Sequence, residues 1–217
     1  AAILMQEFGL EVFPFFINRG QTNYKWEKKS VKFFDNYFKK RYPNLYNNCK
    51  EIKLDTPPLA YKKELRNTKN LTDNVALRKS TAYPARNPII ALTGMEYAYS
   101  LQSKGISPKT VFSVHTADDP VLHSTLTAVR IANLLMCQIT SDYKWQFISL
   151  PIEKELGNYY GKEVMVKWCN ENNIPIEKSR SCYKNSPIHC GECSPACLNR
   201  KEAFKRAGVI DKTIYKI

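Results

Sequence analysis

Four of the seven cysteines lie close together near the C-terminal end, and this cluster constrains the fold more than any other sequence feature. Thiolates suit a borderline-soft cation, and a structural zinc site takes four such ligands in a tetrahedron. The spacing is C-x7-C-x2-C-x3-C, and Gly191 gives the C-x2-C turn a flexible backbone. The spacing therefore predicts a Zn²⁺ site from which His189 is excluded. The predicted ligands are Cys182, Cys190, Cys193 and Cys197.

Two disulfides, or buried free thiols, are the alternative interpretations of these cysteines. Residues 1–7 have neither a basic segment nor a cleavage pattern, so we identify no secretion signal there. We expect a cytoplasmic protein, and a reducing cytosol disfavours disulfides. The longest apolar stretches, residues 12–17 and 131–137, are too short to cross a bilayer, so no membrane partner is expected. The remaining cysteines should pack as small apolar side chains; they are Cys49, Cys137 and Cys169.

Expected strands and helices alternate along the 217 residues. The apolar patterns predict strands at 10–18, 49–54, 110–115 and 145–150, with Pro14 marking an edge or a bulge. They predict helices at 1–8, 24–42, 88–103, 122–139 and 160–172, and a long loop over 56–81. This order predicts an α/β fold, a doubly wound and mostly parallel sheet covered by helices on both faces. We expect an α/β domain over residues 1–178 and a zinc-binding segment over 179–217.

A net charge of +13 suits an anionic partner. A non-catalytic, zinc-containing protein that binds nucleic acid is therefore an alternative of a different class. Tyr24, Trp26 and Tyr37 lie near lysines, and aromatic rings beside cations suit stacking with single-stranded bases. However, the helical pattern places these rings on an apolar stripe, which is expected to pack in the core. A scaffold of four βα units is also larger than a nucleic-acid-binding surface requires. Nucleic acid is therefore not the expected partner.

Ligands of doubly wound sheets bind at the carboxyl ends of the strands. The segments that follow the predicted strands, residues 18–21, 116–119 and 151–162, are therefore candidate site segments, together with the loop 83–87. Arg86, just before a helix start, could pair with a phosphate that also faces the helix N-terminus. Asn87, followed by Pro88, is typical of an ordinary helix N-cap. His115 and His123 could line a pocket, although a lone histidine near a strand end is more often a satisfied polar group.

Several motifs resemble the 7-cyano-7-deazaguanine synthases. Tyr-Pro-Ala-Arg-Asn at 83–87 resembles their Pro-Gly-Arg-Asn loop, and Gly-Lys-Glu-Val at 161–164 resembles the start of a family helix. Residues 181–183, 189–193 and 197–204 match the family's C-terminal zinc segment, and the tail 207–215 follows it too. The resemblance runs in order along the whole chain, and its C-terminal part is the most specific.

The resemblance implies an adenine-nucleotide α-hydrolase fold and an ATP-dependent reaction. Family members adenylate the carboxylate of 7-carboxy-7-deazaguanine, capture ammonia as an amide, and activate again to form the nitrile, with AMP as leaving group. The implied cofactors are Zn²⁺ and ATP with Mg²⁺, and the implied assembly is a homodimer. Arg86 and Lys162 are then the candidate catalytic cations, although a lysine in the first turn of a helix usually faces water. The implied substrate-binding residues are Asp119, Asn87 and Gln21.

The sequence departs from the family pattern in two places, and both affect the assignment of family roles to its residues. The family's Ser-Gly-Gly-x-Asp-Ser phosphate loop is not found in the sequence, and we expect it, with its strand, before Ala1. Residues 118–125 replace the family's Asp-x-x-Gly-Tyr-Pro-Asp-Cys, and residues 18–21 replace its Asp-Tyr-Gly-Gln. Asp119 can still accept hydrogen bonds from a guanine-like edge. An alternative is therefore a divergent anti-phage branch that joins the deazaguanine to an amine of a protein partner.

Overall fold

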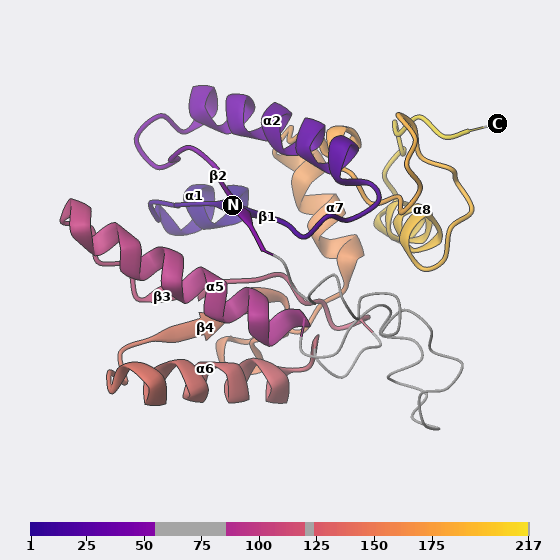
Figure 1. The fold of residues 1–217 in the computed structure, drawn as a ribbon. Coiled ribbons are helices and arrows are strands. Elements are labelled where there is room, and N and C mark those ends of the chain that lie inside the picture. The colour runs from indigo at the N-terminus through magenta and orange to yellow at the C-terminus, as the bar shows by residue number, and fades with distance from the viewer. Residues whose placement is uncertain (55–85, 120–123, 217) are drawn as a thin grey trace, which may run out of the picture. The chain divides into compact units, whose positions relative to one another are not determined.

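The computed structural model describes residues 1–54, 86–119 and 124–216, and the chain forms two compact units. The first unit consists of Ala1–Thr56 and Glu163–Ile217, and the second of Pro57–Lys162. The colour ramp in Figure 1 shows that both ends of the chain belong to the first unit. In the described part of the chain, no helix is long and apolar enough to span a membrane. The predicted loop over 56–81 lies outside the described residues.

The first unit begins with α1 (Ala2–Phe8), which ends at Gly9 with φ at 61° as its glycine signal predicts. Strand β1 (Phe15–Asn18) leads into α2 (Tyr24–Arg41), and β2 (Lys50–Lys53) returns parallel to β1. The register pairs Phe15 with Lys50 and Asn18 with Lys53. The predicted strand over 10–18 was too long and too buried: the regular strand starts only after Pro14, and its residues are half-buried. Proline has no N–H to donate to a ladder, so the strand can begin only beyond it.

The aromatic stripe of α2 packs into a core, as the helical pattern predicts. Phe38 is buried with Met5 of α1 and Ile174, and Phe34 and Tyr37 pack against this cluster. The unit also contains α8 (Ala196–Ala207) and α7 (Lys162–Glu171) from Glu163 onward, and a 3₁₀ turn at Ile176–Lys178 separates the two helices. A smaller cluster forms around Val166, Ala203 and Phe204.

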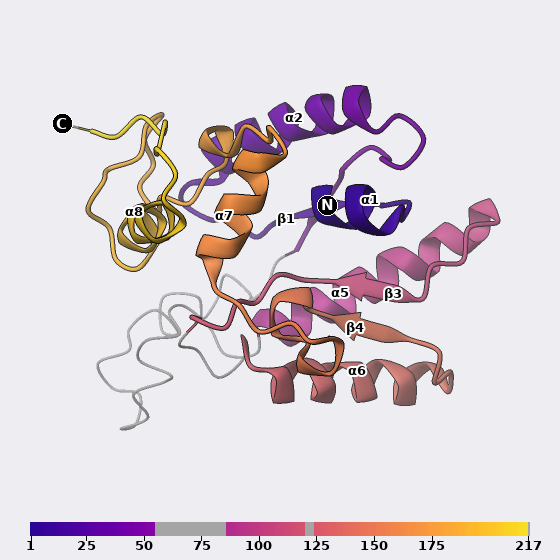
Figure 2. The ribbon, with the colours of Figure 1, turned by 180° about the vertical axis from the view of Figure 1, so that it is seen from behind.

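The second unit repeats the strand–helix–strand pattern. Strand β3 (Thr110–Phe112) follows α5 (Arg86–Leu101), and α6 (Leu126–Thr140) leads to β4 (Gln146–Ile148), which lies parallel to β3. Figure 2 shows α5 and α6 flanking these two strands. Short 3₁₀ turns occupy Gln102–Lys104, Leu150–Ile152 and Lys154–Leu156. The core centres on fully buried Trp145 and Met136. Helix α6 starts four residues later than predicted, because the Thr125 hydroxyl caps it by accepting from the Ala128 N–H at 3.3 Å.

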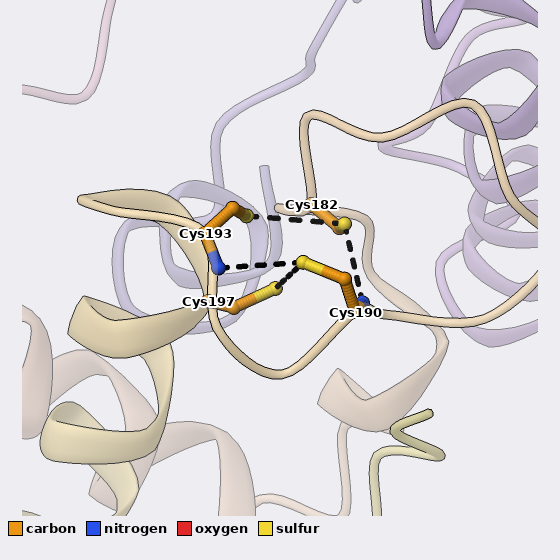
Figure 3. Close-up of side chains that lie close together, drawn as sticks. All are labelled: Cys182, Cys190, Cys193 and Cys197. Atoms are coloured by element: carbon orange, nitrogen blue, oxygen red, sulfur yellow. Dashed lines mark hydrogen bonds between the residues drawn. The ribbon is translucent and has the colours of Figure 1, made fainter. Parts of the chain in front are cut away.

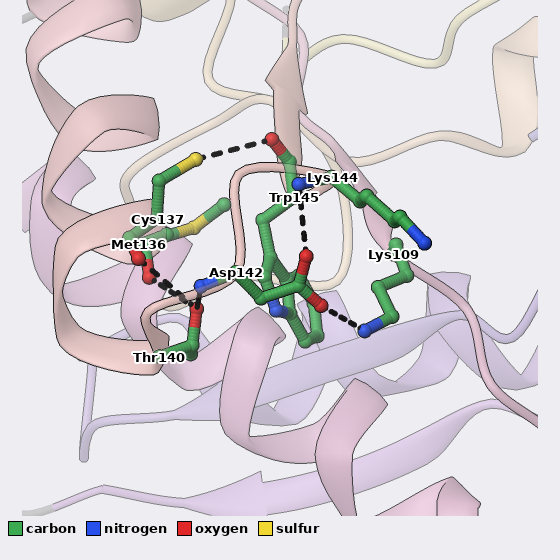
Figure 4. A network of polar contacts seen from close by, with 7 residues as sticks. All are labelled: Lys109, Met136, Cys137, Thr140, Asp142, Lys144 and Trp145. Carbon is green, nitrogen blue, oxygen red and sulfur yellow. Dashed lines mark hydrogen bonds and ion pairs between the residues drawn. The ribbon is translucent and has the colours of Figure 1, made fainter.

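A polar network closes the turn between α6 and β4 (Figure 4). Asp142 pairs with the ammonium group of Lys109 and accepts from the Lys144 N–H at 3.0 Å. The Cys137 thiol donates to the Trp145 carbonyl at 3.4 Å. Hydrogen bonds to Lys109 and to the Lys144 backbone hold the pKa of Asp142 below its usual range, so it stays ionised at neutral pH. The network fixes where β4 begins beside Trp145.

The strands of the described residues form two separate parallel pairs, β1–β2 and β3–β4. The predicted parallel pairing is confirmed, whereas the single doubly wound sheet remains a prediction. The domain boundary at residue 178 and the homodimer also remain predictions.

Arg200 of α8 fastens the C-terminal part of the first unit. Its guanidinium is buried, and it donates to the Thr213 hydroxyl at 3.0 Å, the Ser179 hydroxyl at 2.8 Å and the Ile176 carbonyl at 2.8 Å. It also lies over the Phe204 ring, 5.2 Å from its centre. The planar fork of arginine thus joins three segments through one side chain.

We therefore predict that Arg200→Met lowers the free energy of unfolding by about 2–4 kcal/mol, because it removes three hydrogen bonds to one buried and two half-buried acceptor residues. Arg206→Met on the same helix is the matched control, since Arg206 pairs with exposed Glu202 and its loss should cost less than about 1 kcal/mol. Urea denaturation curves measure both. Equal midpoints for the two variants would contradict the role assigned to Arg200.

Candidate functional site

The four clustered cysteines converge at the start of α8 (Figure 3). Their sulfur atoms all lie within 4.8 Å of one another, and the Cys190–Cys197 and Cys182–Cys193 sulfur pairs are both 3.9 Å apart. Tetrahedral zinc with ligand bonds near 2.3 Å requires sulfur separations of about 3.8 Å, whereas a disulfide requires about 2.05 Å. All seven cysteines are free thiols. The residues present therefore fit a shared metal ion such as zinc, and do not form the two alternative disulfides.

Backbone amides surround the sulfur atoms. The N–H groups of Lys184 and Cys190 each donate to the Cys182 sulfur at 3.4 Å, and that of Cys193 donates to the Cys190 sulfur at 3.3 Å. Gly191 has φ at 80°, and a Cβ there would come within 3.2 Å of the Lys201 ammonium. Only glycine adopts this turn readily, so the flexible backbone expected from the sequence is needed. Amide donors of this kind stabilise metal-bound thiolates.

The ionisation of the thiols differs across the cluster. Hydrogen bonds from the backbone of Glu192 and Cys193 lower the pKa of Cys190 to about 6. Burial raises the pKa of Cys197 to about 12. Because all four ligands must be thiolates, a cation at the centre has to displace protons from the buried sulfur.

The other candidate ligands are engaged elsewhere. The Nε2 atom of His189 accepts from the Ser181 N–H at 3.3 Å, and burial lowers the pKa of this imidazole to about 4. His189 is not part of the four-sulfur group. Cys137 is buried in the core of the second unit, and burial raises the pKa of half-buried Cys49 and Cys169 to about 11. These environments match the packing role expected for the three remaining cysteines.

Lys162 lies at the first residue of α7, and its ammonium group is held by two acceptors of the loop after β3. It donates to the Thr116 hydroxyl at 2.9 Å and to Asp118 Oδ1 at 3.0 Å. Only about one-third of this side chain is exposed, so it does not simply face water as first-turn lysines usually do. Burial alone would raise the pKa of Asp118, but hydrogen bonds from Thr116 and Lys162 hold it below its usual range.

Asn87 and His115 form a buried polar group beside the same loop. The Asn87 amide donates to the Ser124 hydroxyl at 3.3 Å and lies 3.5 Å from Nδ1 of His115. The backbone of His115 exchanges two hydrogen bonds with the Ser149 hydroxyl, at 2.7 and 3.1 Å. The N-cap interpretation of Asn87 was wrong, because α5 already includes Arg86 and places Asn87 inside the helix. The prediction that Asn87 binds substrate stays a prediction.

The remaining predicted residues are distributed over both units. Gln21 follows β1, and its amide donates to the Ile17 carbonyl at 3.1 Å and to Glu27 at 2.7 Å, while its oxygen accepts from the Arg19 N–H. It thus holds its own loop. Arg86 begins α5, and half-buried Asp119 closes a turn through its N–H to the Thr116 carbonyl at 3.0 Å. His123 lies outside the described residues.

The sequence analysis missed Asp118 and Thr116 as partners of Lys162. The available signal was their place in the segment 116–119 at the end of a predicted strand. The sequence pattern singled out the neighbouring carboxylate Asp119 for a different role, binding of a guanine-like edge, and it indicated no partner for Lys162.

Comparison with known proteins places these residues in a family context. A family model described as queuosine biosynthesis protein QueC matches residues 61–208. The 7-cyano-7-deazaguanine synthase of Methanosphaera stadtmanae is 27% identical over 219 residues, covering 92% of this chain and 85% of that protein. The same-named protein of Ruegeria pomeroyi is 28% identical over 138 residues, 63% of this chain and 56% of its own. That of Methanopyrus kandleri is 46% identical over 59 residues, 25% of each chain.

We predict that the reduced protein carries one zinc ion per chain and that Cys182→Ser or Cys197→Ser removes it, because a structural site needs all four ligands. Cys49→Ala and Cys169→Ala are the controls in the same unit and should retain full metal content. Elemental analysis of the purified proteins measures this. Wild-type protein without stoichiometric zinc would contradict the assignment, as would metal loss in either control.

Proposed function

Since this chain belongs to the queuosine biosynthesis protein QueC family, we propose that it is an ATP-dependent carbon–nitrogen ligase acting on a 7-deazaguanine carboxylate. The single observation that carries the proposal is one family match across residues 61–208, a range that includes Lys162 and all four clustered cysteines. Relatives named 7-cyano-7-deazaguanine synthase support the nature of the substrate.

The proposed reaction begins with attack of the substrate carboxylate on ATP. A carboxylate is a poor electrophile, and the acyl-adenylate formed with release of pyrophosphate provides a good leaving group. Ammonia then displaces AMP to give the amide, and a second activation dehydrates the amide to the nitrile. The protein must stabilise negative charge as it develops on phosphate oxygens, which cations and N–H donors accomplish.

Lys162 is suited to such a role. Its ammonium group lies at the carboxyl end of β3, where parallel α/β units bind their ligands, and two acceptors limit its motion. Arg86 is proposed as the second cation, on the basis of its loop motif. Asp119, Asn87 and Gln21 are proposed to contact the base or its surroundings.

The four cysteines would hold zinc in a structural role. Four protein ligands leave no open position on a tetrahedral ion, so it would not activate water or substrate. The ion would instead stabilise residues 182–197, which contain no regular element before α8. ATP and Mg²⁺ are proposed as reactants through the family.

The proposal also has to name the acceptor, the amine that receives the activated acyl group. Residues 118–125 differ from the family motif, and this difference favours a changed acceptor or a changed reading of the base. Ammonia is the proposed acceptor. An amine of a protein partner, as in a defence-associated branch, is the competing outcome.

We predict that the full-length protein releases AMP from ATP only when a 7-deazaguanine carboxylate is present, and that it then forms the nitrile with ammonia. Lys162→Ala and Arg86→Ala should each lower turnover about 10²–10³-fold, because each removes a cation from developing phosphate charge. Lys167→Ala on the same helix is the matched control, since Lys167 is exposed and pairs with exposed Glu171. Chromatography of AMP and mass spectrometry of the nitrile measure these outcomes.

Wild-type turnover in both cation variants would show that the site assignment is wrong. Absence of AMP formation with every deazaguanine carboxylate tested would contradict the proposed function. Formation of AMP with neither amide nor nitrile would exclude ammonia as the productive acceptor and support a protein amine.

A further inference from the structure

Three side chains at the carboxyl end of β3 form a hydrogen-bonded group, here called the ring. Lys162 donates to the Thr116 hydroxyl at 2.9 Å and to the Asp118 carboxylate at 3.0 Å, so its ammonium group joins the two acceptors. We propose that Asp118 is a positioning residue, which orients the Lys162 ammonium toward an anionic oxygen of the substrate. This inference rests on the proposed function, because it assigns a role in that reaction.

The ring leaves one direction open on the ammonium group. A lysine ammonium has three N–H donors in a tetrahedral arrangement. Two of them point to Thr116 and Asp118, and the third has no acceptor among the residues that the structure describes. Thr116 is only 4% exposed, so its hydroxyl is a fixed reference point rather than a mobile surface group. Two fixed acceptors therefore determine where the third donor points.

The backbone holds both sides of the ring in register. The Ala117 N–H donates to the Tyr160 carbonyl at 3.0 Å, which links the loop after β3 to the residue two positions before Lys162. The Asp119 N–H closes a turn on the Thr116 carbonyl, and the Tyr160 N–H donates to the Pro151 carbonyl at 3.0 Å. The ammonium and its acceptors thus sit on segments that are tied to each other.

The charge of Asp118 has a second consequence. A carboxylate beside the ammonium offsets part of its positive charge, so it weakens the attraction of Lys162 for any anion in the ground state. At the same time it fixes the donor direction on which stabilisation of the transition state depends. Removing this carboxylate should therefore strengthen substrate binding and slow the chemical step. A residue with a merely structural role would not separate the two effects in this way.

Asp119 provides a contrast within the same turn. Its main-chain N–H contributes to the turn, but its carboxylate takes no part in the ring. The two neighbouring acidic residues thus have different predicted roles. Asp118 orients Lys162, and Asp119 accepts hydrogen bonds from the base of the substrate.

A double-mutant cycle on the full-length protein tests the proposal, with kcat and KM measured for the deazaguanine carboxylate. Asp118→Asn should lower kcat about 10- to 100-fold, and it should also lower KM. In a Lys162→Met background the same change should alter kcat by less than about twofold, because the group on which Asp118 acts is already absent. Asp118→Glu, which keeps the charge, should recover part of kcat. A rise in KM, or an undiminished kcat loss in the Lys162→Met background, would overturn the proposal.

Asp119→Asn is the matched control for the coupling. It should change the kinetics by the same factor with Lys162 present or absent, since its carboxylate lies outside the ring. Equal coupling of Asp119 and Asp118 to Lys162 would contradict the assignment.

A second double-mutant cycle measures the equilibrium constant for unfolding and therefore does not depend on catalysis. Asp118→Asn and Lys162→Met should show a coupling of about two- to fivefold, as expected for a partly exposed ion pair. If the wild type forms no AMP, the proposed function fails while this cycle still reports on the ring. A coupling factor of one would overturn the orientation of Lys162 by Asp118 whatever the catalytic result.

Discussion

The convergence of four sulfur atoms is the constraint on which the C-terminal part of the first unit depends. Thiolates less than 5 Å apart repel one another unless a cation lies among them. The segment that carries them has few other means of support, because residues 182–195 contain no regular helix or strand. Its supports are backbone amides directed at sulfur and a bridge between His189 and Tyr215. A bound ion would complete a framework that the hydrogen bonds have already arranged.

The two parallel strand pairs use one structural device twice. In each, a helix connects two parallel strands, and an acidic group pairs with a lysine close to the strands. In the first pair, Asn18 at the end of β1 donates to Glu51 of β2 at 3.1 Å, and Lys28 pairs with the same carboxylate at 2.7 Å. After β3, Thr116 and Asp118 accept from Lys162. In both cases a neutral side chain hydrogen-bonds one member of the ion pair, so the charges remain oriented while partly exposed.

This arrangement would suit a lysine near water to the role proposed for Lys162. A freely moving ammonium group contributes mainly a diffuse positive charge, whereas an ammonium with two fixed acceptors offers a directed donor. The buried group of Asn87, His115 and Ser124 lies beside the same loop and adds polar support behind it. The electrostatic role proposed for Lys162 would therefore depend on several residues that only hold the loop in place.

The sequence alone determined the features that depend on local spacing. The grouping of the four sulfurs follows from C-x7-C-x2-C-x3-C, because they lie on one short segment. The α2 stripe follows from the helical period, and the end of α1 follows from Gly9. Tertiary structure decided what depends on residues far apart in the chain. It placed Asn87 inside α5 and brought Asp118 and Thr116 to Lys162, 44 and 46 positions away. It also buried Arg200 and gave its guanidinium hydrogen bonds to three separate segments. A side chain's partner across such separations is set by how the elements pack, and periodicity carries no information about that distance.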